Sequence, residues 1–224
     1  MLDEVLPGLI RIPLNPFEMG NVYLLGDVLV DSGAPFSAGQ IFTALKGREV
    51  TAHALTHAHF DHQGSSHAIC QELQIPLWCG EGDQAAVESG DLSTLLPNPH
   101  SWIARFGKFM AGPAHPVSRS LQEGDQVGGF TVISTPGHTP GHLAYWREED
   151  QALVLGDVLF HRNPLTFRQG LQEPFRMATF DPVVNRQSAR KLADLEPAVI
   201  CFGHGPPLRD TQVFLSYVDR LAKD

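Results

Sequence analysis

The stretch THAHFDHQG, from Thr56 to Gly64, places three histidines and an aspartate within six consecutive positions. It follows the apolar segment 50–55, which predicts a β-strand that enters the cluster. Imidazoles make poor hydrophobic core, and an ordinary surface has no use for so many of them. At a strand end the side chains of residues i and i+2 share a face. His57 and His59 are therefore expected to reach the same ion.

Asp61 and His62 lie where the chain turns from this strand into a predicted helix, so their side chains are expected to point elsewhere. One short loop can then supply ligands to two neighbouring ions. Imidazole together with carboxylate suits zinc, iron or manganese rather than calcium or magnesium. We interpret the stretch as a metal-binding loop and not as a polar turn with chance histidines.

Three segments further along the chain end in a side chain that can bind a metal. TPGHTPGHLAYW places His138 in a turn after a predicted strand, LVLGDVLF places Asp157 at the end of another, and VICFGHGPP does the same with His204. Strand ends along one edge of a sheet are where functional residues collect, because the sheet holds them while the loops vary. We expect these three residues to lie close to the stretch 56–64, which we call the histidine loop.

The bulk properties of the chain limit its class. It has 224 residues, 42% of them hydrophobic, and a formal net charge of −9. The length predicts one domain over 1–224, and the acidic charge argues against binding to nucleic acid. No apolar run approaches the roughly 18 residues that span a bilayer, and the acidic start resembles no signal peptide. We expect a cytoplasmic protein without a membrane partner.

Strand and helix signals alternate along the sequence. Strands are predicted over 9–14, 21–33 (a hairpin turning at Gly26-Asp27), 51–57, 76–80, 128–137, 142–146, 152–160 and 198–205. Helices are predicted over 37–47, 62–74, 81–90, 181–196 and 210–224. Residues 91–119 and 161–179 are expected to be irregular, the first with one short helix. The pattern predicts an α+β fold, a four-layer αββα sandwich in which two mixed β-sheets pack face to face with helices outside.

The ordered motifs resemble those of the metallo-β-lactamase-fold hydrolase superfamily. They are Asp31 in VLVDSG, the loop THAHFDH, His138, Asp157 and His204. They extend over nearly the whole chain and in the same order, which makes the resemblance specific for the fold and the metal site. It is much less specific for the substrate.

This resemblance implies a role for each motif residue. Six of them divide into two sets of metal ligands, His57, His59 and His138 for the first ion and Asp61, His62 and His204 for the second. Asp157 would bridge both ions. Asp31 would orient the site without binding metal. Two divalent ions are thus expected as cofactors, with zinc preferred over iron and manganese.

The same resemblance implies a mechanism. Zinc lowers the pKa of a bound water to about 7, so a hydroxide that bridges the ions would attack the substrate. Asp61 and Asp157 are the expected catalytic carboxylates, and Asp61 would orient the nucleophile or carry its proton. Two dications, two carboxylates and one hydroxide leave a net charge of about +1, which favours an anionic tetrahedral intermediate.

Details of the motifs narrow the branch of the superfamily. True metallo-β-lactamases generally lack an aspartate at the place of Asp157, and flavodiiron proteins carry a glutamate at the place of His59. PGHTPGH and GDVLF most resemble glyoxalase II-like thioesterases. However, HRNPLTFRQG replaces the glycine-arginine element of that group, and its C-terminal helical domain has no counterpart after His204.

We therefore predict a hydrolase of a small-molecule ester, thioester or lactone, with a glyoxalase II-like thioesterase favoured. An acyl-homoserine-lactone-type lactonase is the alternative within this class. A mononuclear iron dioxygenase acting on persulfides, or a metal-binding module without catalysis, are the alternatives from other classes. These motifs leave the oligomeric state open.

The two irregular segments are expected to form the walls of the substrate pocket. The aromatic candidates are Phe106, Phe109, Phe167 and Phe175, and the cations that would pair with a substrate carboxylate or phosphate are Arg162, Arg168 and Arg176. Among the remaining histidines, His53 and His67 are expected on the surface or on a helix flank, and His142 is expected to be structural. The three cysteines form no CxxC pair and are expected to be reduced and mostly buried.

Overall fold

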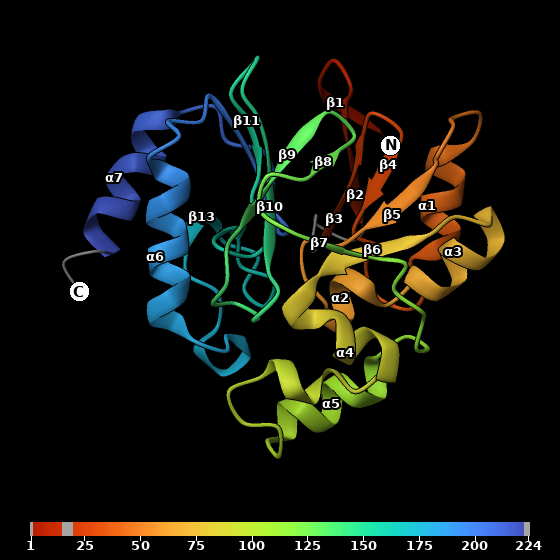
Figure 1. Ribbon diagram of the computed structural model, residues 1–224. Helices are drawn as coiled ribbons and strands as arrows, with labels where there is room; N and C mark the ends of the chain where they lie inside the picture. Colours follow the sequence, from red (N-terminus) through yellow and green to blue (C-terminus); the bar gives the residue numbers. More distant parts are fainter. Residues whose placement is uncertain (1, 15–19, 222–224) are drawn as a thin grey trace.

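The computed structural model describes residues 2–14 and 20–221, and two β-sheets stand at its centre (Figure 1). The first sheet comes from the first 121 residues and keeps its strands in chain order. Its strands are β1 (Asp3–Leu6), β2 (Leu9–Leu14), β3 (Gly20–Leu25), β4 (Val28–Val30), β5 (Ala52–Ala54), β6 (Leu77–Gly80) and β7 (Arg119–Leu121). Strands β1 to β4 pair antiparallel and β4 to β7 pair parallel. Parallel pairing follows from the helical connections between the later strands.

The second sheet has the strand order β14-β11-β10-β9-β8. Its strands are β8 (Gln126–Val127), β9 (Phe130–Ser134), β10 (Leu143–Arg147), β11 (Ala152–Val154) and β14 (Val199–Cys201). Only β11 and β14 pair in parallel in this sheet, so both sheets are mixed. A separate hairpin of β12 (Phe160–Arg162) and β13 (Gln169–Gln172) follows β11.

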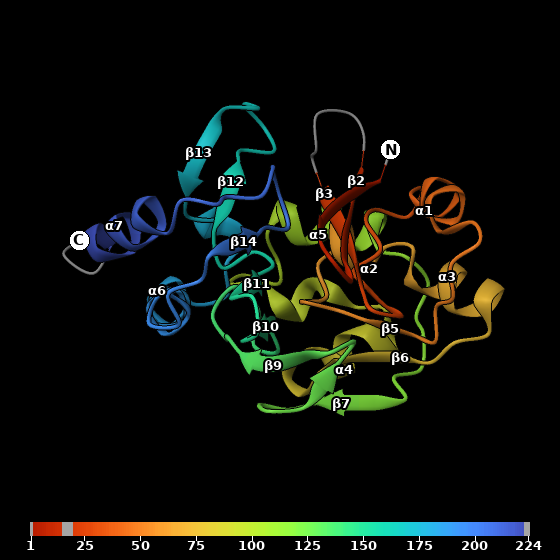
Figure 2. The same ribbon diagram turned by 90° about the horizontal axis from the view of Figure 1, so that it is seen from above.

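Helices cover the outer face of each sheet, as the view from above shows (Figure 2). The helices of the described chain are α1 (Ala38–Leu45), α2 (Phe60–Gln63), α3 (Ser66–Leu73), α4 (Glu81–Ser89), α5 (Trp102–Met110), α6 (Pro182–Ala193) and α7 (Thr211–Leu221), with short 3-10 turns η1 (Leu92–Leu95) and η2 (Arg176–Ala178). α1 and α3 pack on the first sheet, and α6 and α7 pack on the second. The predicted four layers are therefore confirmed.

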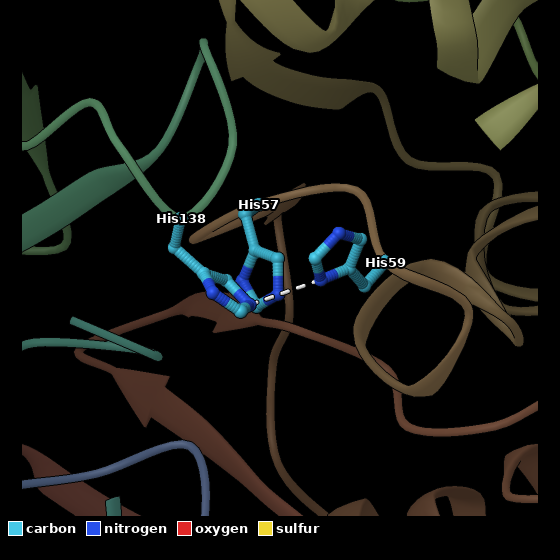
Figure 3. A group of neighbouring side chains, drawn as sticks. All are labelled: His57, His59 and His138. Atoms are coloured by element: carbon cyan, nitrogen blue, oxygen red, sulfur yellow. Dashed lines mark hydrogen bonds between the residues drawn. The ribbon is translucent and has the colours of Figure 1, made fainter. Parts of the chain in front are cut away.

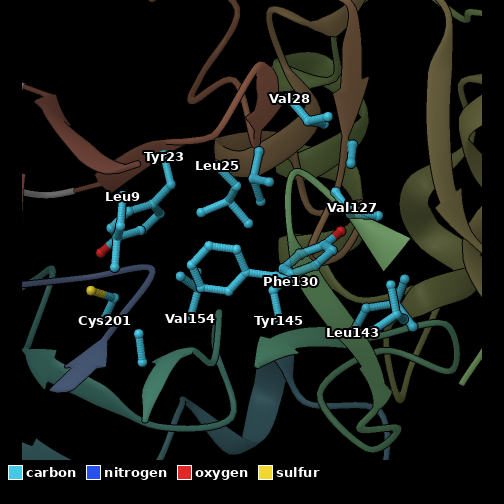
Figure 4. Close-up of a cluster of buried hydrophobic side chains, with 14 of the residues drawn as sticks. Leu9, Tyr23, Leu25, Val28, Val127, Phe130, Leu143, Tyr145, Val154 and Cys201 are labelled. Carbon is cyan, nitrogen blue, oxygen red and sulfur yellow. The ribbon is translucent and has the colours of Figure 1, made fainter. Parts of the chain in front are cut away.

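The central core lies between the two sheets (Figure 4). Alternation along β3 explains how one strand serves two layers: Tyr23 and Leu25 face the other sheet, whereas Val22 and Leu24 face the helices. The buried Tyr23 hydroxyl donates to the carbonyl of Phe202 at 2.7 Å. In return, Tyr145 of the second sheet donates to the carbonyl of Leu55 at 2.6 Å. Each bond fixes a loop that leaves the opposite sheet.

The structure corrects several predicted boundaries. The strand predicted over 51–57 ends at Ala54, and the helix predicted over 62–74 is broken between α2 and α3. Gly64 lies at this break, where a Cβ would come within 2.6 Å of Pro35. The segment 161–179 is more regular than expected, since it holds most of the β12–β13 hairpin and η2. The part of the last predicted helix at 222–224 lies outside the described residues.

The predictions for the hairpin, the helix cap and the cysteines are confirmed. The hairpin turns at Gly26-Asp27, and Asp181 caps α6 by accepting from the backbone N–H groups of Val183 and Val184. All three cysteines are free and buried. Within the described residues no helix is both long and apolar enough to cross a membrane.

Candidate metal centre

Four loops bring the candidate ligands together. Each loop follows a strand, β5, β9, β11 or β14, and its first ligand comes three or four residues after the strand ends. These ligands are His57, His138, Asp157 and His204, and the first loop adds His59, Asp61 and His62. All seven except Asp61 are buried, and the Asp61 side chain is 34% exposed. We call these seven residues the candidate metal centre.

The first set is shown in Figure 3. The ligand atoms of His57, His59 and His138 all lie within 4.8 Å of one another. Nδ1 of His59 and Nε2 of His138 are only 3.0 Å apart. Although the strand ends before His57, its loop still turns two imidazoles toward the imidazole of His138, which comes from the loop after β9.

The second set lies beside the first. Asp61, His62 and His204 also place their ligand atoms within 4.8 Å of one another. The two Nε2 atoms of His62 and His204 are 3.5 Å apart, and Oδ2 of Asp61 is 3.6 Å from Nε2 of His204. Members of the two sets also meet, because His57, His62 and Asp157 form a third group whose ligand atoms lie within the same distance.

Asp157 lies between these two sets. Its Oδ2 atom lies near the Nε2 atoms of four histidines, at 3.2 Å from His204, 3.4 Å from His62, 3.6 Å from His138 and 3.9 Å from His57. Gly203 permits this approach, because a Cβ there would overlap Oδ1 of Asp157. One carboxylate therefore contacts members of both sets.

The donor atoms fit divalent metal ions. Among the described residues, Nε2 of His57 and Oδ1 of Asp157 are buried and have no hydrogen-bond partner. Buried polar atoms without a partner are rare because leaving water without a replacement is costly. Imidazole and carboxylate donors that converge in this way suit zinc, iron or manganese.

Residues 15–204 match the Metallo-beta-lactamase superfamily. The chain belongs to this superfamily. It is 30% identical to the probable metallo-hydrolase YflN of Bacillus subtilis (strain 168), over 85% of this chain and 82% of that protein. It is 27% identical to a hydroxyacylglutathione hydrolase of Bdellovibrio bacteriovorus, over 74% of this chain and 61% of that protein. The solved structure of TTHA1623 in a di-iron-bound form has a TM-score of 0.68 at 29% identity, with 92% of this chain and 96% of that chain covered.

Burial sets the protonation of the first set of this metallo-β-lactamase-fold centre. It lowers the pKa of His59 to about 4, and it lowers the pKa values of His57 and His138 well below the usual value. The three imidazoles are therefore neutral at pH 7, which is the form that binds metal.

The residues around Asp157 behave differently. Burial alone would lower the pKa values of His62 and His204, but nearby carboxylates outweigh it and raise both. Asp157 and Asp31 act on His62, and Asp157 and Asp61 act on His204. Burial alone would likewise raise the pKa of Asp157, but His204 and His62 outweigh it and hold that pKa well below its usual range. Asp157 is therefore an anion that stabilises the protonated form of both histidines of the second set.

Asp31 lies behind the second set. Its Oδ2 accepts a hydrogen bond from Nδ1 of His62 at 2.9 Å and one from the Thr56 hydroxyl at 2.7 Å. Its Oδ1 accepts from the backbone N–H of Thr56 at 2.7 Å. Asp31 thus fixes the imidazole of His62 and the start of the histidine loop together.

His142 holds the backbone of Asp157 in place. Its Nε2 accepts from the backbone N–H of Asp157 at 3.1 Å, and its Nδ1 lies 2.8 Å from the Thr135 hydroxyl. It is fully buried and contacts the ligand loops rather than the surface. This is a structural position, as the sequence predicted.

No sequence motif indicates a role for Asp83. This buried residue of α4 accepts from the backbone N–H of Ala58 at 2.9 Å, the Thr139 hydroxyl at 2.7 Å and the backbone N–H of Gly141 at 2.7 Å. Ala58 lies between two ligands of the histidine loop, and Thr139 follows His138. One carboxylate therefore joins the two loops that carry the first set. In the sequence it is only one acid in the first turn of a helix.

The prediction for His53 was wrong. This histidine is fully buried on β5, with Nδ1 at 3.0 Å from the Leu29 carbonyl and Nε2 at 2.9 Å from the Ser66 hydroxyl. A strand inside a parallel region has both faces covered, so a polar residue on it must find partners in the interior. His67 is half-buried, with Nδ1 at 3.1 Å from the Ala114 carbonyl.

A cavity of about 680 Å³ opens over the candidate metal centre. His59, Asp61, His138, Asp157 and His204 form its floor. Of the residues expected to bind substrate, Phe106 and Phe175 line it. The others lie outside the described lining, namely Phe109, Phe167, Arg162, Arg168 and Arg176.

Proposed function

We propose that this protein is a metal-dependent hydrolase that holds two divalent ions and cleaves an ester, thioester or lactone bond. One observation carries the proposal: Oδ2 of Asp157 lies within 3.9 Å of four histidine nitrogens, drawn from both sets of ligands. A carboxylate in this position suits a bridge between two ions.

The residues would divide between the ions as their grouping suggests. One ion would be held by His57, His59 and His138, the other by Asp61, His62 and His204, and both by Asp157. When bound, such ions lower the pKa of a water to about 7 and polarise the carbonyl of a substrate. We propose zinc as the resident metal, with iron as the main competitor because TTHA1623 was solved in a di-iron-bound form.

Asp61 is proposed to move the proton. Its side chain is the most exposed of the seven and lies on the floor of the cavity. A carboxylate that faces both the substrate space and the ligand set is placed to accept the proton of the attacking water and to deliver it to the leaving group. Asp31 holds His62 in place during this step through its hydrogen bond to Nδ1.

Thioester cleavage is the favoured reaction. The sequence motifs resemble glyoxalase II-like thioesterases, and a hydroxyacylglutathione hydrolase is among the relatives. A lactonase is the alternative of the same class, since both reactions attack an acyl carbon and expel an alkoxide or thiolate.

The test combines elemental analysis of the purified protein with hydrolysis assays after loading with zinc, iron or manganese. We expect two ions per chain and turnover of thioesters, lactones or aryl esters. Asp61→Asn should lower kcat about 100-fold or more, and His67→Ala, outside the centre, should leave it unchanged. One tightly bound ion at full activity would refute the two-ion site. Oxygen consumption on a persulfide would assign an iron dioxygenase, and two bound ions without turnover would assign a module without catalysis.

A further inference from the structure

The walls of the cavity are apolar almost throughout. Apart from the five residues of its floor and Ser37, every described lining residue is a hydrocarbon, aromatic, methionine, proline or glycine residue. The aromatic ones are Phe36, Phe60, Trp102, Phe106, Phe160 and Phe175. No lysine or arginine belongs to this described lining.

Three of the large apolar residues that line the cavity are unusually exposed. Phe36 is 77% exposed, Leu165 73% and Trp102 71%, although all three line the cavity. They come from three distant segments of the chain, yet they meet over one site. Exposed apolar surface gathered around a cavity is typical of a ligand-binding site. An apolar ligand would remove this surface from water.

Helix α5 presents one apolar face to this cavity. Trp102, Ile103, Phe106 and Met110 line it, and their spacing places them along one side of a helix. Arg105, Lys108 and Phe109 are exposed and lie outside the described lining. The helix therefore keeps its cations away from the cavity.

The apolar wall begins at the metal centre itself. The ring of Phe106 packs edge-on against the ring of Phe60, with 5.8 Å between the centroids. Phe60 stands between His59 and Asp61 in the sequence, and all four residues line the cavity. A group bound at the ions would therefore continue directly along Phe106.

We propose that the acyl group cleaved here is an uncharged hydrocarbon chain or ring, and that acyl groups and leaving groups carrying carboxylates, glutathione among them, are poor substrates. This inference rests on the proposed function and names its substrate class. A carboxylate taken into the apolar part of this cavity would lose water and meet no lysine or arginine among the described lining residues, which disfavours it. The volume of about 680 Å³ lies in the range of small-molecule sites.

The experiment uses the metal-loaded protein and N-acetylcysteamine thioesters with acetyl, butyryl, hexanoyl and octanoyl groups. We expect kcat/KM to rise about fourfold per methylene, equivalent to about 0.8 kcal/mol, until the cavity is filled. Succinyl thioester replaces the terminal methyl of butyryl by a carboxylate, and we expect it to react at least tenfold more slowly. The glutathione thioester of butyrate should also be poorer than the N-acetylcysteamine one.

A matched pair of variants locates the effect. Phe106→Ala should lower kcat/KM for octanoyl thioester about 10- to 100-fold and for acetyl thioester less than about threefold. Phe109→Ala makes the same change on the same helix, outside the described lining, and should leave the whole series unchanged. Equal losses on every chain length in Phe106→Ala would overturn the assignment of this wall.

Binding of S-alkyl-N-acetylcysteamine thioethers, which cannot be hydrolysed, gives a readout independent of turnover. Calorimetry on metal-free and metal-loaded protein should give tighter binding with each added methylene. Tight thioether binding without thioester hydrolysis would support the apolar site and overturn the proposed function alone. Hydrolysis that is indifferent to chain length, or fastest with succinyl thioester, would overturn this inference and leave the proposed function standing.

Discussion

Replacing Asp83 by asparagine should weaken metal binding while the protein stays folded. The carboxylate accepts hydrogen bonds at both oxygens, from Ala58 and Thr139 on one side and Gly141 on the other. The asparagine amide offers one oxygen, so in either orientation at least one buried backbone N–H loses its acceptor. Such a loss costs about 1–3 kcal/mol.

That energy now helps to hold the loops of His57, His59 and His138 in place. If the loss of this hydrogen bond appears fully as weaker metal binding, the affinity for the metal should fall about 10- to 100-fold, since about 1.4 kcal/mol corresponds to tenfold. Substitution of groups that orient metal ligands has effects of about this size. The fold should persist because burial already raises the pKa of Asp83 to about 6, so the neutral amide avoids the cost of a buried charge.

The assay is a zinc titration of metal-free protein against a chromophoric chelator, together with thermal unfolding and kcat at saturating metal. Glu81→Gln is the matched control, because it removes the same charge from an exposed position in the same turn of α4. It should bind zinc as the wild type does. If Asp83→Asn also binds zinc normally but unfolds at a lower temperature, Asp83 stabilises the fold and does not position the ligands.

Three further perturbations should have distinct effects. Asp157→Ala should lose both ions and all acyl hydrolysis, whereas His67→Ala should keep both, as elemental analysis and rate measurements will show; equal losses would mean that the ligands are wrongly assigned. Burial lowers the pKa of His53 from 6.5 to about 4, so its contribution to stability is present above pH 6.5 and is lost as the pH falls toward 4. Denaturant unfolding of metal-free protein should therefore show wild type losing about 3 kcal/mol more than His53→Gln across this window, and parallel pH profiles would count against it. Phe214→Ala should lower the free energy of unfolding in urea by about 3–5 kcal/mol, because this ring is fully buried between α7 and the second sheet. Val213→Ala, on the exposed side of the same helix, should change the free energy of unfolding little. A similarly small change in both variants would refute the packing argument.

The candidate metal ligands could be predicted from the sequence because each of the four loops follows a strand signal, and histidine and aspartate clustered at strand ends favour metal binding over other roles. His57, Asp157 and His204 are cases of this kind, and the structure brings them together. This grouping did not depend on the exact end of the strand. His57 still lies with the other candidate ligands although β5 ends at Ala54.

Partners that depend on three-dimensional contact left no such signal. Asp83 lies in a helix, 25 residues from Ala58 and 58 from Gly141, and nothing in its local sequence distinguishes it from an acid at a helix N-terminus. The placement of the candidate arginines outside the described cavity lining has a related reason. Arg162 and Arg168 lie on or beside the β12–β13 hairpin. The sequence predicts an irregular segment there, so the direction of these side chains could not be inferred.

The paired tyrosine bonds between the sheets have a consequence for the order of folding. Tyr23 of the first sheet holds the loop of the second at Phe202, and Tyr145 of the second holds the loop of the first at Leu55. Neither half of the chain carries a complete set of candidate ligands, so we expect the ions to be captured only after the halves have docked. The rate of metal uptake during refolding should therefore report the rate at which the two halves dock. Two separately produced halves should bind zinc tightly only when they are mixed.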